Sequence, residues 1–218
     1  RMFRREDVDL REAAESIDAS KKEVERLDAI LNQFLKALRP AKLHFRPTDL
    51  RTVLEESLNF MRHEIENRNV EIQCHWADAL PQIPADEGQL KQAFFNLIKN
   101  ALQSMPQGGT LSLFCELNDE QEVEVRIMDT GKGIPAENLS KLFHAFYTTK
   151  ATGNGLGLMI VERIIRQHGA RLSVESVEEK GTCFTVTFPR SGNRVRILPP
   201  ANAYAGILPA AGEGEKNA

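Results

Sequence analysis

Apolar residues near the start of the chain recur at helical spacing. They are separated by alternating steps of three and four residues: Val24, Leu27, Leu31, Phe34 and Leu38. Ile17 extends this series by one heptad, and Ser20 interrupts it. Because no glycine or proline precedes Pro40, the pattern predicts a helix over residues 7–38, about 48 Å long at 1.5 Å per residue. Its apolar stripe needs a partner. We expect a second copy of the chain, hence a homodimer; packing against the next domain is the alternative.

From residue 41 onward, helical and strand-like sequence patterns alternate. Helices are predicted from Thr48 or Asp49 to about Asn67, from an N-cap at Asp86 to Met105, and up to His168, where Gly169 is the C-cap. Strands are predicted over residues 43–45, 70–76, 110–117, 122–128, 171–177 and 182–188. Regular βαβ repeats are missing from this order. It therefore predicts an α+β fold, a two-layer α/β sandwich with helices on one face of a mixed, mainly antiparallel sheet.

Composition separates the two ends from this domain. Ala, Gly and Pro supply 12 of the 20 positions in residues 199–218, which predicts a flexible tail. The division is a dimerisation helix over 1–40, a domain over 41–190 and a tail over 191–218.

A net charge of −3 gives no global basic field, so we expect no nucleic-acid partner. No apolar run reaches the roughly 18 residues of a membrane span. We therefore expect a cytoplasmic location and no membrane contact by this chain, with any anchor of the natural protein lying elsewhere.

The three cysteines, Cys74, Cys115 and Cys183, are 41 and 68 residues apart, which fits no metal-site spacing. Each lies in a strand-like apolar stretch. We therefore expect buried, small side chains in a reducing compartment.

Two motifs offer polar groups next to predicted elements. The helix that begins at Asp86 carries Asn96 and Asn100 on one face, and two amides so placed can coordinate a hard cation or bind phosphate oxygens. Asp129 follows the strand 122–128 directly. Its carboxylate can accept from an exocyclic amine, and the glycines in Asp129-Thr130-Gly131-Lys132-Gly133 let the backbone approach a flat ring. An ordinary turn after a strand is the alternative for this second motif.

A third motif, Gly153-Asn154-Gly155-Leu156-Gly157-Leu158, opens the helix that ends at His168. Backbone N–H groups and the helix dipole at such a start favour phosphate. The motif lacks the Lys-Ser/Thr of a Walker A loop and does not follow a strand in a βαβ unit.

In this order, the motifs resemble the ATP-binding domain of sensor histidine kinases, which shares a superfamily with DNA gyrase, MutL and the heat-shock chaperone ATPases. The resemblance covers roughly residues 41–190 and includes the Phe-bearing segment 142–150 and Gly181-Thr182. It implies a protein-histidine kinase of a two-component system that uses ATP and Mg²⁺. The γ-phosphoryl group would pass to a histidine and then to an aspartate of a response-regulator receiver domain.

The resemblance also assigns roles to individual residues. Asn100 would be the Mg²⁺ ligand, Asp129 would accept from the adenine amino group, and Asn96 and Lys150 would be the catalytic residues. Residues 143–154 would form a mobile lid, in which Lys150 contacts phosphate or is simply solvated. Gln103 stands where many members carry a basic residue, which puts a phosphate contact there in doubt. The complete nucleotide-binding set implied is Asn96, Asn100, Asp129, Gly131, Gly133, Phe143, Thr149, Lys150, Gly153, Gly155, Leu156, Gly157, Leu158 and Thr182.

The residue at the position of Asn96 distinguishes the branches of this superfamily. The ATPases carry a glutamate there as general base, whereas an amide takes up no proton at neutral pH. Asn96 therefore favours phosphoryl transfer over hydrolysis and disfavours a gyrase-type ATPase. The alternatives are an anti-sigma-type serine kinase, which would normally lack the heptad helix, and a non-catalytic nucleotide-binding dimerisation module.

No acceptor histidine is expected within the chain. The N-terminal helix resembles the second helix of the dimerisation and phosphotransfer hairpin, and the histidine would stand on the first helix, before it. His63-Glu64 opens like an acceptor box, but no proline follows Asn67. We expect the chain to bind Mg²⁺-ATP without phosphorylating its own histidines.

Overall fold

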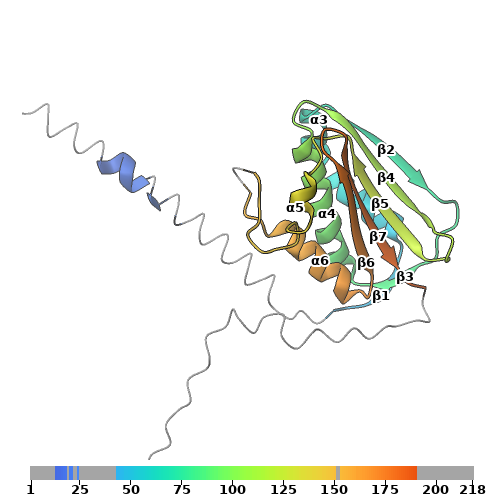
Figure 1. Cartoon of the computed structure of the whole chain (residues 1–218). Coiled ribbons are helices and arrows are strands. Elements are labelled where there is room, and N and C mark those ends of the chain that lie inside the picture. Colours follow the sequence, from blue (N-terminus) through green and yellow to red (C-terminus); the bar gives the residue numbers. More distant parts are fainter. Residues whose placement is uncertain (1–12, 19, 22–23, 25–42, 151–152, 191–218) are drawn as a thin grey trace, which may run out of the picture.

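The computed structural model describes residues 13–18, 20–21, 24, 43–150 and 153–190. Figure 1 shows helices packed on one face of a twisted sheet. The helices of the domain are α2 (Leu50–Phe60), α3 (Arg62–Asn67), α4 (Glu87–Ser104), α5 (Ala136–Leu139) and α6 (Gly157–Gln167). The strands are β1 (Arg46–Thr48), β2 (Val70–Trp76), β3 (Ile83–Ala85), β4 (Gly109–Leu117), β5 (Val123–Asp129), β6 (Arg171–Val177) and β7 (Gly181–Phe188).

The main sheet has five strands in the order β2-β4-β5-β7-β6. Only β2 and β4 are parallel, so the predicted mixed, mainly antiparallel sheet is confirmed. The pairing of β5 with β7 sets Asp129 opposite Thr182 at one end of the sheet. These two side chains therefore stand side by side on the same face.

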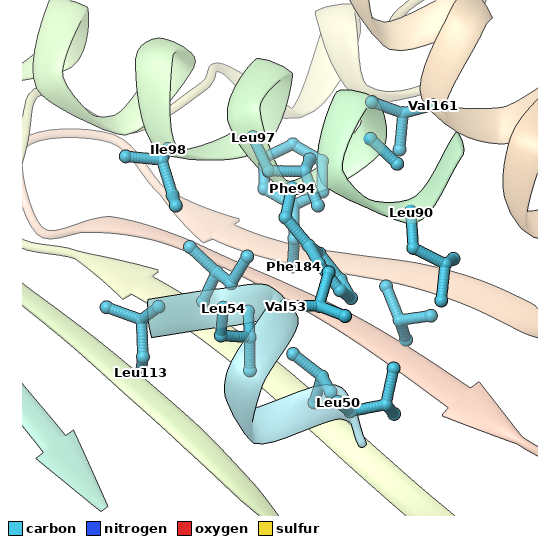
Figure 2. Packing of buried hydrophobic residues seen from close by; sticks show 14 of the residues in the cluster. Leu50, Val53, Leu54, Leu90, Phe94, Leu97, Ile98, Leu113, Val161 and Phe184 are labelled. Carbon is cyan, nitrogen blue, oxygen red and sulfur yellow. The ribbon is translucent and has the colours of Figure 1, made fainter. Parts of the chain in front are cut away.

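The core lies between the sheet and helices α2, α4 and α6 (Figure 2). Its central residues are fully or almost fully buried: Leu50, Val53, Leu54, Leu90, Phe94, Leu97, Ile98, Leu113, Val161 and Phe184. Because α4 packs against α2, α6 and the sheet, it is a rigid base for the polar side chains on its remaining face.

Both predicted helix starts are confirmed by side-chain caps. The Asp49 carboxylate accepts from the backbone N–H of Arg51, and that of Asp86 accepts from Gln89. Each cap satisfies an N–H group that has no partner within the helix, which fixes where α2 and α4 begin.

Some local predictions are wrong. The first strand is Arg46–Thr48 rather than 43–45, and its partner, Ile83–Ala85, was not predicted. Three-residue strands that contain Pro47 and Pro84 show no period-two pattern. The helix predicted up to Asn67 is divided at Met61 into α2 and α3.

The cysteines also differ from the prediction in part. Cys115 is buried, and burial raises the pKa of its thiol to about 12, whereas Cys183 is half-buried. Cys74 is exposed, because β2 is an edge strand of the sheet.

Most of the predicted N-terminal helix and the tail 191–218 lie outside the described residues. Residues 13–18, 20–21 and 24 are helical. Ile17 and Val24 of the predicted stripe are exposed, at 69% and 60%. None of the helices in the described residues has the length and apolar character that a membrane span requires.

Candidate functional site

A cavity of about 430 Å³ lies where α4, the start of α6 and the ends of β5 and β7 meet the loops between them. Segments from residue 96 to residue 184 line it. The three sequence motifs, which are separated along the chain, therefore contribute to one site.

Asn96 and Asn100 line this cavity from α4, opposite the face that carries Leu97 and Ile98 into the core. The Nζ atom of Lys150 donates to Oδ1 of Asn100 at 3.0 Å and to Oε1 of Gln103 at 2.7 Å. The lysine thus reaches from the segment before α6 to the polar face of α4.

The environment of Lys150 is unfavourable for a positive charge. Burial, followed by repulsion from other cations such as Lys132 and Lys99, lowers its pKa to about 8. Attraction to Asp129 opposes this shift. An anion that enters the cavity would find a partly desolvated ammonium group, whose interaction with negative charge is stronger than at the surface.

Asp129 is 5% exposed and lines the cavity beside Ser104. Burial raises the pKa of its carboxyl group, while hydrogen bonds from Ser104, Gly131 and Thr182 oppose the shift. Its Oδ1 accepts from the Ser104 hydroxyl at 2.8 Å and from the Gly131 backbone N–H at 2.9 Å. The carboxylate is therefore held in one orientation.

The glycines beside Asp129 are required by close packing. A Cβ atom on Gly131 would lie 2.0 Å from the Ser104 oxygen. Gly133 has a φ of +66°, and a Cβ atom there would lie 2.1 Å from the carbonyl oxygen of Val177. The loop 131–134 is thereby pressed against the end of β6, and it forms one wall of the cavity.

The segment before α6 forms another wall of the cavity. A backbone hydrogen bond joins the two ends of this segment. The backbone N–H of Phe146 donates to the carbonyl of Gly155 at 3.1 Å, and Gly155 has a φ of +66°. The Tyr147 hydroxyl donates to Oδ1 of Asn138 at 2.6 Å. Of the predicted lid, Phe146 is thus bonded to Gly155 and Tyr147 to Asn138, while residues 151–152 lie outside the described part of the chain.

The start of α6 faces the cavity through Gly157 and Leu158. Among the described residues, no side chain caps this helix, and its first internal hydrogen bond is donated by Ile160 to Leu156. The N–H groups of the first turn therefore have no partner within the helix, and the helix dipole adds to their attraction for negative charge.

The structure brings most of the sequence-predicted residues to this cavity. Those that line it are Asn96, Asn100, Asp129, Gly133, Thr149, Lys150, Gly153, Gly155, Gly157, Leu158 and Thr182. Three do not. Gly131 lies behind Asp129, Phe143 packs against the core, and Leu156 is fully buried.

Sequence analysis assigned no role to other cavity residues, among them Lys99, Ser104, Lys132, Ile134, Asn138, Tyr147, Glu178, Glu179 and Phe184. Ser104 was detectable in principle, since it continues the helix face of Asn96 and Asn100 at steps of four. The glutamates lie in the β6–β7 turn and gave no signal.

Comparison with known proteins identifies the domain that contains this cavity. Residues 85–192 match the family model described as histidine kinase-, DNA gyrase B-, and HSP90-like ATPase. This match contains all three motifs. The chain belongs to the histidine kinase ATP-binding domain family. The resemblance inferred from the sequence is thereby confirmed.

Individual histidine kinases support this placement. The chain is 35% identical over 178 residues to sensor histidine kinase ZraS of Escherichia coli (strain K12). The aligned region covers 82% of this chain and 38% of ZraS. The chain is 36% identical over 169 residues to sporulation kinase A of Bacillus subtilis (strain 168), covering 77% and 28% of the two chains. The chain thus spans less than two-fifths of the length of these relatives.

Solved structures show the same fold. Full-length ShkA in complex with AMPPNP matches with a TM-score of 0.68 and 27% identity, over 78% of this chain and 37% of ShkA. The mycobacterial sensor histidine kinase MprB matches with a TM-score of 0.60 and 28% identity, over 67% of this chain and 97% of the other.

Proposed function

We propose that this domain binds Mg²⁺-ATP in the cavity and is the kinase part of a two-component sensor kinase. The observation that carries the proposal is the convergence of Asn100, Asp129 and the Gly155–Gly157 backbone on one cavity. ShkA, a solved histidine kinase with the same fold, holds the ATP analogue AMPPNP, which supports a nucleotide as the ligand.

The two ends of the cavity suit the two ends of ATP. The Asp129 carboxylate, fixed by Ser104 and Gly131, would accept a hydrogen bond from the adenine amino group. The N–H groups at the start of α6, which lies beside Asn96, would hold the phosphates, and the Lys150 ammonium would approach them from its place at Asn100. Thr149 and Gly153 also line the cavity.

Magnesium fits the donors on α4. The described residues hold no cluster of three or more His, Cys, Asp or Glu that could hold a metal ion by itself. Mg²⁺ in kinases needs only one or two protein oxygens, since phosphates and water complete its coordination. Oδ1 of Asn100 lines the cavity and already accepts a hydrogen bond from the Lys150 ammonium, so it is an oxygen that a cation in the cavity can reach. When bound, the ion would neutralise charge on the phosphates, with Asn100 as its protein ligand.

The position of carboxylates favours transfer over hydrolysis. The acidic residues that line the cavity are Asp129, Glu178 and Glu179, all near the loop 131–134. The residues of α4 that line the cavity are Asn96, Lys99, Asn100, Ala101, Gln103 and Ser104. None of them is a carboxylate that could act as general base toward water, so the γ-phosphoryl group would remain for an external acceptor.

The proposed acceptor is a histidine outside this chain, and the final acceptor an aspartate of a response-regulator receiver domain. The chain has five histidines, and none of them lines the cavity. His63 of α3 is exposed, whereas His168, at the end of α6, is partly buried and accepts a hydrogen bond from the backbone N–H of Asp86. We therefore propose that the isolated chain does not phosphorylate itself on histidine. The proposal also includes a homodimer through the N-terminal helix and a cytoplasmic location, where ATP is supplied.

Calorimetric titration with ATP, with and without Mg²⁺, tests this function directly. We expect saturable binding of ATP that is stronger with Mg²⁺, and Asn100→Ala should remove most of the Mg²⁺ effect. Incubation with radiolabelled ATP should yield no acid-labile, base-stable phosphoprotein. Absence of binding would refute the nucleotide site, steady release of phosphate would restore the ATPase alternative, and labelling of any histidine would refute the external acceptor.

A further inference from the structure

Ser176 lies beside the cavity without lining it, and its hydroxyl oxygen has three polar neighbours. The backbone N–H of Ile134 is 2.8 Å away, the carbonyl oxygen of Gly181 is 2.9 Å away and Oγ1 of Thr182 is 2.9 Å away. The first of these can only donate, the second can only accept, and the Thr182 hydroxyl can do either.

Only one arrangement of protons satisfies all three contacts. A serine hydroxyl has one proton and two lone pairs. Ser176 must accept from Ile134 and give its own proton to Gly181, because neither backbone group can reverse its role. Thr182 must then donate to Ser176. The Thr182 proton therefore points away from the cavity, and its oxygen offers lone pairs alone.

Thr182 acts together with its neighbours at this end of the cavity. It is 5% exposed, lines the cavity and stands opposite Asp129 in the β5–β7 pairing. The ionised Asp129 carboxylate only accepts. The Ser104 proton is directed to the Ala101 carbonyl at 2.6 Å or to Asp129 at 2.8 Å. These three side chains, Ser104, Asp129 and Thr182, thus present acceptors and no donor.

We propose that Ser176 is a positioning residue for nucleobase selection, acting through the direction of the Thr182 hydroxyl. This inference rests on the proposed function and names its substrate preference. A purine with an amino group at C6 supplies donors to the acceptors. A purine with a 6-oxo group brings a further acceptor against Thr182 and Asp129, and a polar group left unpaired in a buried site is costly.

The test is the ratio of the dissociation constants of ITP and ATP, measured by calorimetry on the full chain. We expect the unchanged protein to prefer ATP. In Ser176→Ala the Thr182 hydroxyl is free to turn and donate to the 6-oxo group, so the preference should fall roughly 3- to 10-fold, the value of one hydrogen bond. Ser173→Ala, an exposed position on the same strand, should keep the original ratio.

A second pair of variants separates this role from a merely structural one. Thr182→Val removes the hydroxyl and should also lower the preference, whereas Thr182→Ser should retain it. In the Thr182→Val background, Ser176→Ala should change the ratio no further, because its effect passes through the hydroxyl. If Ser176→Ala does not fold, an unchanged ratio in Thr182→Val still overturns the inference, because Ser176 can act only through this hydroxyl.

An unchanged ratio in Ser176→Ala, or a further change in the Thr182→Val background, would overturn the inference while leaving ATP binding intact. Failure of the unchanged protein to bind ATP would instead refute the proposed function.

Discussion

The ammonium group of Lys150 lies 3.0 Å from Oδ1 of Asn100, 50 residues earlier in the chain. The same group lies 2.7 Å from Gln103, where the family resemblance led us to look for a basic residue. Lys150 therefore brings to this part of α4 the positive charge that Gln103 lacks. It comes from the segment whose ends, Phe146 and Gly155, are tied together.

Lys150→Met should weaken binding of ATP more than binding of ADP. The variant keeps the length of the side chain and removes the charge that we place beside the terminal phosphate. Loss of one charge-assisted hydrogen bond costs roughly 1.5–3 kcal/mol, about 10- to 150-fold in affinity. Calorimetry with both nucleotides measures the difference. Lys141→Met, an exposed position outside the cavity, is the control. Equal losses for ATP and ADP would place Lys150 away from the terminal phosphate.

Asp129→Asn should separate nucleotide binding from stability. The amide still accepts from Ser104 and Gly131 on one side, but its other group is a donor and would face the adenine amino group. We expect ATP affinity to fall about 10- to 150-fold. Calorimetry measures this loss, with Asp119→Asn in the exposed β4–β5 turn as the control.

The same variant should not destabilise the nucleotide-free domain. Burial raises the pKa of Asp129, so ionisation of this group costs folding free energy above that pKa, and the cost disappears as the pH falls through it. At neutral pH, Asp129→Asn removes the buried charge. The urea midpoint should therefore stay equal or rise. A clear fall of the urea midpoint would mean that the hydrogen bonds to the carboxylate stabilise its charge by more than burial destabilises it.

His168 should make the domain less stable in mild acid. Its Nε2 accepts from the backbone N–H of Asp86 at 3.0 Å, while Nδ1 lies 2.7 Å from the carbonyl oxygen of Ile164. The neutral ring with its proton on Nδ1 satisfies both contacts, and a protonated ring cannot accept from Asp86. Burial lowers the pKa of His168 below 6.5, against the attraction of Asp86.

The sign of the pH effect follows from this shift. The unfolded chain binds the proton more tightly than the folded one, so the stabilisation is complete above about pH 6.5 and is lost as the pH falls below it. One proton limits the slope to about 1.4 kcal/mol per pH unit. His168→Asn should flatten the urea stability profile in this range, whereas His63→Gln on the exposed α3 should not. An unchanged slope in His168→Asn would assign the acid sensitivity to other groups.

The sequence was informative where a local rule and the tertiary structure agree. Asp86 is both a capping residue and the start of a periodic helix, so α4 and its two asparagines were predicted at the right place. The alternation of apolar and polar residues in strands β4 to β7 likewise predicted the sheet. Prediction failed where tertiary pairing determines the structure, as in β1 and β3, in which Pro47 lies opposite Pro84. The sequence analysis missed one hydrogen-bond partner of Asp129, Ser104, for the same reason. Ser104 lies 25 residues away, and only packing of α4 on β5 brings it into contact.

Gly131 gives the last test, because its role depends on a side chain that the motif does not contain. An added Cβ atom would lie 2.0 Å from the Ser104 oxygen and 2.7 Å from Oδ1 of Asp129. Gly131→Ala should therefore displace Asp129 and weaken ATP binding. The reduction should be at least the tenfold expected for one charge-assisted hydrogen bond.

Removal of the obstructing group should restore part of this loss. In Gly131→Ala with Ser104→Gly, both Ser104 atoms that obstruct the new Cβ are removed, the oxygen at 2.0 Å and the Cβ at 2.6 Å. Calorimetry should then show tighter ATP binding than in Gly131→Ala alone. Gly88→Ala is the matched control. Gly88 lies in the first turn of α4 with only ordinary contact at 3.5 Å, so this change should raise stability by about 0.5–1 kcal/mol and leave binding unaltered. If the double variant binds ATP no better than Gly131→Ala, the glycine is needed for direct approach of the nucleotide and not for the Ser104–Asp129 contact.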